Sequence, residues 1–201
     1  MNQLTPQDLL SHADYERSRE SFRQRIIALK HRRRIEVGGK LSLVFENRDT
    51  MRFQVQEMIR AERIYDPVKI QDELDVYNAL LPAAGELSAT LFIEITDEAR
   101  VKPDLNALQG IDRGETIVLA VGSQAVWGVF EGGHSKEDKL SAVHFVRFHP
   151  ARAWLDALAA KNSQATVSVR HPACQASVSV PEAMRQEWLS DLGLISAPAG
   201  S

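Results

Sequence analysis

The chain has 201 residues, of which 44% are hydrophobic and 25% are charged, so it has the composition and length of a globular protein with a sizeable core. Its formal net charge of −3 excludes a general electrostatic attraction to nucleic acid or to anionic membranes. Cys174 is the single cysteine, which excludes an internal disulfide and a zinc ribbon.

The N-terminal sequence MNQLTPQDLLSHADYE is polar and acidic, whereas a signal peptide begins with basic residues followed by an apolar stretch. No apolar run approaches the roughly 20 residues that a membrane helix needs. We therefore expect a cytoplasmic protein without a membrane partner. Residues 1–195 are expected to form a single α+β domain, and residues 196–201 a disordered tail.

Helical patterns dominate the N-terminal part of the chain. Thr5-Pro6-Gln7-Asp8 has a capping hydroxyl, a proline at the first helical position and an acid at the third, which predicts a short leading helix. From Asp14 to about Arg33, apolar residues recur at spacings of three, four and seven, which predicts a long amphipathic helix. The elements predicted next are a turn at 38–39, a strand over 41–45, and helices over about 50–64 and from 66 to about 82.

Strand patterns dominate the rest of the chain, where segments rich in β-branched and aromatic residues are separated by turn residues. We expect a mainly antiparallel sheet of about five to seven strands, packed with the N-terminal helices and with flanking helices. Pro103 is expected to break a helical stretch over about 97–108, and Ser179 to cap a last helix that Gly193 ends. The predicted strands cover 90–95, 116–121, 125–130 and 142–148, with a hairpin over 166–180.

Five stretches of the sequence carry a more specific signal: FENRDTMRFQVQEMIRAERIYDP, IQDELDVYNALLP, ATLFIEI, KLSAVHFVRF and VRHPAC. In order and spacing they resemble the DUF3501 family, a bacterial family of domains of unknown function, over Leu4 to about Val180. The resemblance implies a fold-sized unit but supplies no catalytic residues. Because family members are often encoded beside rubrerythrin-like and iron–sulfur oxidoreductase proteins, it also implies redox or iron proteins as partners.

Two carboxylates, Glu57 and Glu62, fall among apolar positions when the helix predicted over 50–64 is plotted at about 100° per residue. A carboxylate buried in this way must be neutral, paired with an arginine or bound to a cation. One interpretation is a structural Glu–Arg network, and the other is a metal-binding or catalytic carboxylate pair. The arginines available to such a network are Arg52, Arg60 and Arg63 on the same helix and Arg147 on a predicted strand.

His144 lies in the strand predicted over 142–148, which is apolar on both faces, and Glu94 is a polar residue in a second apolar strand. If these strands are neighbours, His144, Glu94 and Glu57 or Glu62 could converge on a site for a divalent metal such as iron, manganese or zinc. The alternative is a core histidine that is satisfied by a carboxylate.

A basic run at the end of the long helix has no acidic residue to offset it, and it also contains His31. Such a run complements the helix dipole and is commonly a solvated face. The functional alternative is contact with an anion or a nucleic acid, although no helix-turn-helix, RRM or KH signature supports nucleic acid as a partner. The candidate anion-binding residues are Arg23, Arg25, Lys30, Arg32, Arg33 and Arg34.

No P-loop, GxSxG, HExxH or GxGxxG motif is present, so the sequence assigns no catalytic residue. It favours a cytoplasmic accessory or binding protein with a metal-binding polar site and a link to redox or iron metabolism. Two alternatives stay open. The first is a metal- or carboxylate-dependent enzyme that uses Glu57, Glu62, Glu94 and His144, and the second is an RNA or nucleotide binder that uses the basic run.

Overall fold

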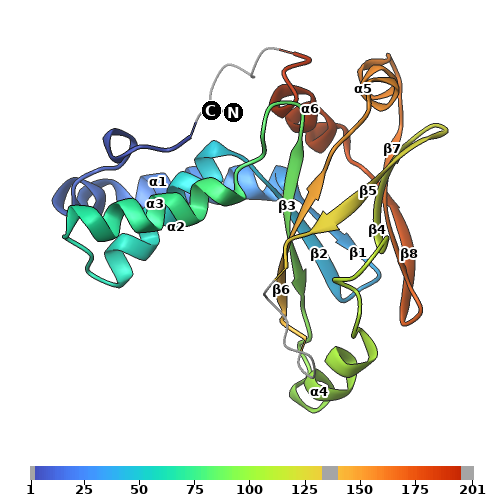
Figure 1. The fold of residues 1–201 in the computed structure, drawn as a ribbon, viewed down its shortest axis with the longest axis horizontal. Coiled ribbons are helices and arrows are strands. Elements are labelled where there is room, and N and C mark those ends of the chain that lie inside the picture. The colour runs from blue at the N-terminus through green and yellow to red at the C-terminus, as the bar shows by residue number, and fades with distance from the viewer. Residues whose placement is uncertain (1–2, 133–139, 196–201) are drawn as a thin grey trace.

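The computed structural model describes residues 3–132 and 140–195, so the tail predicted at 196–201 lies outside the described residues. Figure 1 shows helices and strands as one continuous fold, in which a curved sheet stands beside a group of helices. In chain order the elements are η1 (Pro6–Asp8), α1 (His12–Arg33), β1 (Arg34–Val37), β2 (Leu41–Glu46), α2 (Arg48–Ala61), α3 (Pro67–Leu80), β3 (Leu87–Ile93), α4 (Glu98–Ala107), β4 (Ile117–Val121), β5 (Gln124–Phe130), β6 (Val143–Phe148), α5 (Arg152–Ala159), β7 (Ala165–His171), β8 (Cys174–Ser179) and α6 (Glu182–Asp191).

The described strands form one antiparallel sheet in the order β1-β2-β3-β6-β5-β4-β7-β8. The sheet curls until its two edges meet, since β1 also contacts β7 and β8, and the result is nearly a barrel (Figure 1). Gly38, in the turn between β1 and β2, allows this approach. Its φ of +70° suits glycine, and a Cβ at this position would lie 2.5 Å from the Sγ of Cys174 on β8.

The neighbouring strands β2, β3 and β6 separate two packed layers. On one face, Phe45 and Phe148 pack with Trp188 of α6 in the main hydrophobic core. On the opposite face, Phe145 packs against a second cluster that is built largely from α2 and α3. Because side chains alternate along a strand, each residue of these three strands faces one layer or the other.

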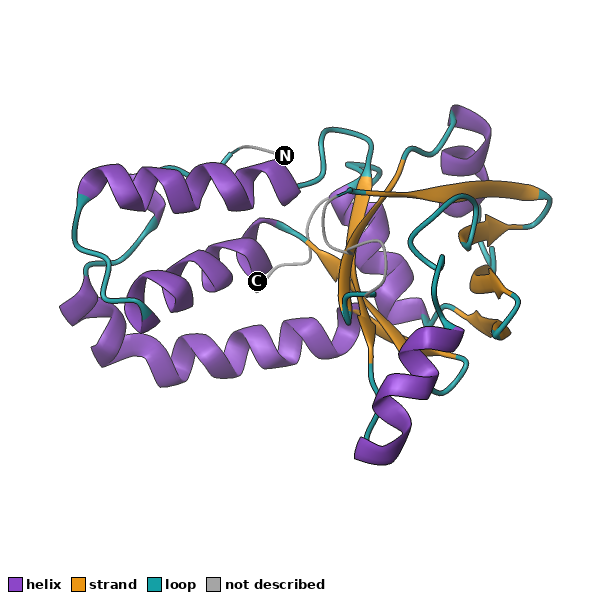
Figure 2. Cartoon of the chain, turned by 60° about the horizontal axis from the view of Figure 1, so that its bottom comes forward, coloured by secondary structure: helices purple, strands orange, loops and turns teal. Residues whose placement is uncertain are grey.

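Helices α1, α2 and α3, which we call the helical arm, extend from one side of the sheet (Figure 2). α2 is the middle helix and contacts both of the others. Its Met51 and Val55 pack with Leu74 of α3, while Phe53 packs edge-on against Phe22 of α1 at a ring-centroid distance of 5.7 Å. Among the described residues, no helix is both long and apolar enough to span a membrane.

The N-terminal segment, residues 4–11, lies against the helical arm and is attached by two side-chain amides. Asn78 accepts from the main-chain N–H of Leu4 at 2.7 Å and donates to its carbonyl at 2.8 Å. Gln56 does the same for Leu10, at 2.9 Å and 3.2 Å. Leu4 is buried, whereas the side chain of Leu10 is exposed.

The predicted α+β class and antiparallel sheet are confirmed, but the expected five to seven strands are too few. The described residues contain eight strands, and the additional one is β1, which begins at Arg34 of the basic run and ends just before the predicted turn at 38–39. Pro103 does not break α4, because a proline removes a single main-chain bond and Lys40 and Arg100 both bind Asp104, the residue that follows it. Ser179 belongs to β8 and does not cap α6.

The close approach at Gly38 generates a stability prediction. Gly38→Ala should lower the free energy of unfolding by about 2–3 kcal/mol, because the new Cβ adds strain at positive φ and meets the Cys174 sulfur. Gly39→Ala is the matched control, since Gly39 has a φ of +76° but its new Cβ would meet nothing within 4 Å, and it should cost only about 1 kcal/mol. Urea denaturation measures both. Equal losses would show that the contact with β8 does not constrain the turn.

Candidate functional site

The structure does not bring together the four residues predicted to bind a metal. Leu91 of β3 pairs with His144 of β6, so His144 shares its face of the sheet with the odd-numbered residues of β3. Glu94 follows β3 on the other face, where it accepts hydrogen bonds from Arg34 and, at 2.9 Å, from Ser42. The Arg34 contact lowers the pKa of Glu94.

His144 is only 1% exposed, and it faces the main core. Its Nε2 lies 2.7 Å from the carbonyl oxygen of Ser141, and its Nδ1 lies 3.7 Å from a carboxylate oxygen of Asp112. The helical arm covers the opposite face of the sheet, so neither Glu57 nor Glu62 can approach this imidazole. Within residues 3–132 and 140–195, no three His, Cys, Asp or Glu side chains are grouped to hold a metal ion. The described residues therefore do not form the predicted metal site.

Glu57 lies in a Glu–Arg network between α1 and α2. Its carboxylate accepts two hydrogen bonds of 2.8 Å from Arg19 and one of 2.7 Å from the Tyr15 hydroxyl, and Arg60 approaches to 3.4 Å. The hydrogen bonds from Arg19, with that from Tyr15, hold the pKa of Glu57 at about 2. Burial and the neighbouring carboxylate raise the pKa of Tyr15. This network fixes the two helices against each other.

Other residues predicted for this network lie elsewhere. α2 ends at Ala61, and Glu62 is its C-cap residue. The next residue, Arg63, has a φ of +53°, which ends the helical conformation. Glu62 is therefore exposed and does not lie on the apolar face of the helix. Arg63 is exposed as well. Arg147 lies on β6, where it donates to Glu131 at 2.6 Å and to the carbonyl of Leu81 at 2.9 Å.

The basic run is divided among different environments and is not one anion-binding surface. Arg33 is fully buried and donates to Glu187 and Asp191 of α6 and to the main-chain carbonyl of Phe45. Arg32 donates to the same Glu187 at 2.8 Å. Arg34 is the first residue of β1 and pairs with Glu94, while Arg23 is exposed and Lys30 is half-buried on α1.

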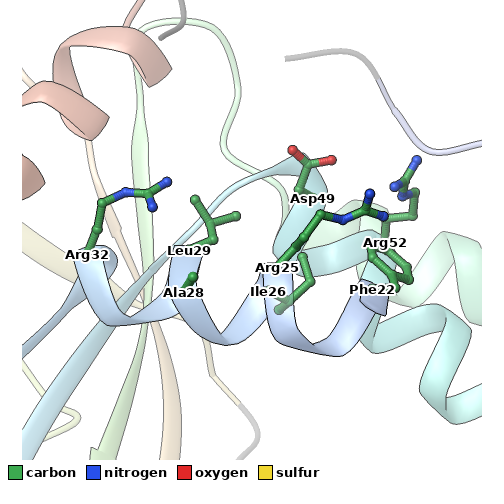
Figure 3. Close-up of a pocket in the computed structure, with 8 residues that line it drawn as sticks. All are labelled: Phe22, Arg25, Ile26, Ala28, Leu29, Arg32, Asp49 and Arg52. Carbon is green, nitrogen blue, oxygen red and sulfur yellow. The ribbon is translucent and has the colours of Figure 1, made fainter. Parts of the chain in front are cut away.

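Arg25 of the basic run and Arg52 of α2 meet across a surface groove between the two helices, the α1–α2 groove. One half of it encloses about 380 Å³, and the adjoining half encloses about 440 Å³. Phe22, Arg25 and Arg52 line both halves and therefore mark the centre (Figure 3). The half nearer the sheet is also lined by Ile26, Ala28, Leu29, Arg32 and Asp49, and the other half by Asp8, Leu10, Asp14, Ser18 and Gln56.

Among the described residues, the two central arginines lack anionic partners. The guanidinium carbons of Arg25 and Arg52 lie 5.5 Å and 4.9 Å from the centre of the Phe22 ring, where cation–π attraction holds them. They are therefore no more than about 10 Å apart and repel each other. Within the described ranges neither guanidinium has a carboxylate or carbonyl partner, and the Nε of Arg52 is buried without a hydrogen bond.

The sequence placed Arg25 and Arg52 in two different candidate sets, one for anion binding and one for the Glu–Arg network. Their convergence depends on the packing of α1 against α2. Phe22 is one of the apolar residues whose spacing predicts the helix from Asp14 to about Arg33, and neither candidate set contains it. The apolar spacing around Phe22 and Phe53 was the signal that these two helix faces meet.

The fold and the groove define a class of protein that combines a nearly closed antiparallel sheet with a three-helix arm. The family model described as "Protein of unknown function (DUF3501)" matches residues 3–192, and the chain belongs to this family. A crystal structure of a protein of unknown function from Burkholderia pseudomallei is similar, with a TM-score of 0.88 and 32% sequence identity. The match covers 95% of this chain and 100% of that one. No curated protein sequence matches the chain.

The Glu57 network predicts a pH-dependent contribution to stability. Because its pKa is lowered in the folded state, ionised Glu57 stabilises the protein above the ordinary carboxyl pKa of 4.5, and this contribution disappears as the pH falls towards 2. Glu57→Gln should cost about 2 kcal/mol at neutral pH, since the side chain is 25% exposed and its loss leaves Arg19 uncompensated.

The matched control is Glu62→Gln, at an exposed position at the end of the same helix, which should change stability by less than about 0.5 kcal/mol. Denaturant unfolding between pH 7 and pH 2.5 measures both variants against the native protein. A deficit for Glu57→Gln that stays constant over this range would contradict the assigned role of the carboxylate.

Proposed function

We propose that this protein is a binding protein that holds an anionic group in the α1–α2 groove. The observation that carries the proposal is the pair Arg25 and Arg52, which meet at the Phe22 ring without an anionic partner in the described structure. Two arginines that are buried elsewhere have several partners. Arg33 and Arg185 each donate to several carboxylate, hydroxyl or carbonyl oxygens.

The groove has the chemistry that anion recognition needs. A guanidinium presents a planar set of donors that can bind a carboxylate or a phosphate through two parallel hydrogen bonds. Phe22 beneath the pair keeps water from one side, which strengthens the attraction to an anion. Each half of the groove also has a volume within the range of small-ligand sites, about 300–1,000 Å³.

The side chains that line the groove favour binding over catalysis. Among the described residues they include three arginines and three aspartates but no histidine or cysteine. Asp8 is committed to an ion pair of 2.6 Å with Arg48, and the hydrogen bond from Arg48 keeps the pKa of Asp8 at about 2. As partners we propose the redox or iron proteins that the family resemblance implies, in the cytoplasm.

An anion titration tests the proposal. Pyrophosphate, added at low ionic strength, should shift the amide NMR signals of the residues around Phe22 and should bind more weakly as salt is added. Arg25→Gln and Arg52→Gln should each weaken binding by about tenfold or more, equivalent to about 1.4 kcal/mol. Arg23→Gln removes the same charge from the exposed face of α1 and should change the affinity by less than about twofold. Equal effects of all three substitutions would overturn the proposal.

Asp49 provides an independent test, in which the substitution should strengthen anion binding. It lines the groove near the N-terminus of α2 and forms no ion pair with either central arginine, so its charge repels an incoming anion (Figure 3). Asp49→Asn should therefore strengthen pyrophosphate binding by about two- to fivefold, which corresponds to about 0.5–1 kcal/mol. Isothermal titration calorimetry measures the change, and an unchanged or weaker affinity would place the bound anion away from Asp49.

A further inference from the structure

The residues that line the α1–α2 groove follow a spacing that suits a third helix. On α1 they include positions 18, 22, 25, 29 and 32, which are separated alternately by four and three residues. On α2 they are positions 49, 52 and 56, separated by three and four. This alternation is the spacing of side chains that face a packed helix in coiled coils and helical bundles. The groove therefore has two parallel rows of side chains between which a helix can lie.

The N-terminal segment borders one end of the groove. Leu10 of the N-terminal segment lines the half that is farther from the sheet and is tied there to Gln56. From Phe22 to Arg32 the groove is open, and at 1.5 Å per residue this stretch is about 15 Å long, or roughly three helical turns. A small ion would fill only the centre of a groove of this length.

The charges in the open stretch specify the side chains of the occupant. Arg25 and Arg32 are seven residues apart on α1, so they are separated by about 10.5 Å along the helix axis. Two carboxylates seven residues apart on a docked helix have the same separation. Ala28 and Leu29 lie between the arginines, as Figure 3 shows, and Ala28, which is exposed, and the 7% of Leu29 that is exposed offer a narrow apolar surface to the residues between those carboxylates.

We infer that the occupant of the α1–α2 groove is an acidic amphipathic helix of a partner protein. Its carboxylates pair with Arg25 and Arg52 and with the remaining N–H groups of Arg32, whose Nε already donates to Glu187, and its apolar side chains pack on Ala28 and on the small exposed edge of Leu29. This inference rests on the proposed function, because it names the molecule that presents the anionic group to the arginine pair. It adds a length, a secondary structure and a charge pattern to the proposed ligand.

A pair of peptides tests the inference on the full chain. The first is a capped, fluorescein-labelled helical peptide of 21 residues, with leucines at alternating spacings of three and four and two glutamates seven residues apart. The second has lysines in place of these glutamates. In fluorescence anisotropy at low ionic strength, the glutamate peptide should bind, and the lysine peptide should bind at least about tenfold more weakly.

Charge reversal in the protein should reverse its preference between the two peptides. Arg25→Glu combined with Arg52→Glu should weaken binding of the glutamate peptide by about thirtyfold or more and should allow the lysine peptide to bind. Arg23→Glu, on the exposed face of α1, is the matched control and should change neither affinity by more than about twofold. If the doubly reversed variant does not fold, Arg25→Gln with Arg52→Gln replaces it and should abolish the preference for the glutamate peptide.

The outcomes separate the inference from the proposed function. Arginine-dependent binding of pyrophosphate without binding of the glutamate peptide would overturn the helical ligand and leave the anion site in place. Loss of both would overturn both. Sedimentation velocity tests whether a second copy of this chain occupies the groove. A concentration-dependent dimer that Arg25→Glu disrupts would identify the second copy as the ligand and would overturn the inference of a helix from a partner protein.

Discussion

The contacts of Arg33 join the three parts of the structure. This guanidinium is completely buried where α1 meets the sheet, and it donates to carbonyl groups at the end of β2 and to Glu187 and Asp191 of α6. Removing the carboxylate partners of such a buried charge would strongly destabilise the folded protein. Burial raises the pKa of Asp191 even beside Arg33, so part of the attraction offsets the loss of solvation. The helical arm, β2 and α6 therefore hold one another in place through one side chain.

Because Arg33 is anchored at this end of α1, the direction of the whole helix is determined. The core residues Tyr15, Phe22, Ile26 and Leu29 then face α2, and the adjacent row that contains Arg25 and Arg32 borders the open groove. Arg19, bound to Glu57, fixes the other half of α1 against α2. With both ends held, the cationic side chains of the groove have a rigid support, which reduces the entropy lost when a ligand binds.

Local signals in the sequence predicted many of the elements, and tertiary packing decided the site. Asn47 and Asp66 cap α2 and α3 near the predicted starts of these helices, and the predicted strands of the second half belong to the sheet. Helical periodicity could not show that α2 ends before Glu62, because the positive φ of Arg63 that follows is a backbone property. The register of β3 and β6, which separates Glu94 from His144, is likewise a relation between strands. No pattern in α1 alone distinguishes buried Arg33 from exposed Arg23.

The attachment of the N-terminal segment has a consequence for sequence variation. Gln56 and Asn78 each hold a main-chain N–H and C=O group, groups that every residue except proline supplies. The side chain of Leu10 is exposed, so almost any amino acid can replace it and keep its main-chain hydrogen bonds to Gln56. Leu4 has less freedom because its side chain is buried. Substitutions should therefore accumulate at position 10 far more readily than at position 56, although the two residues share the same pair of hydrogen bonds.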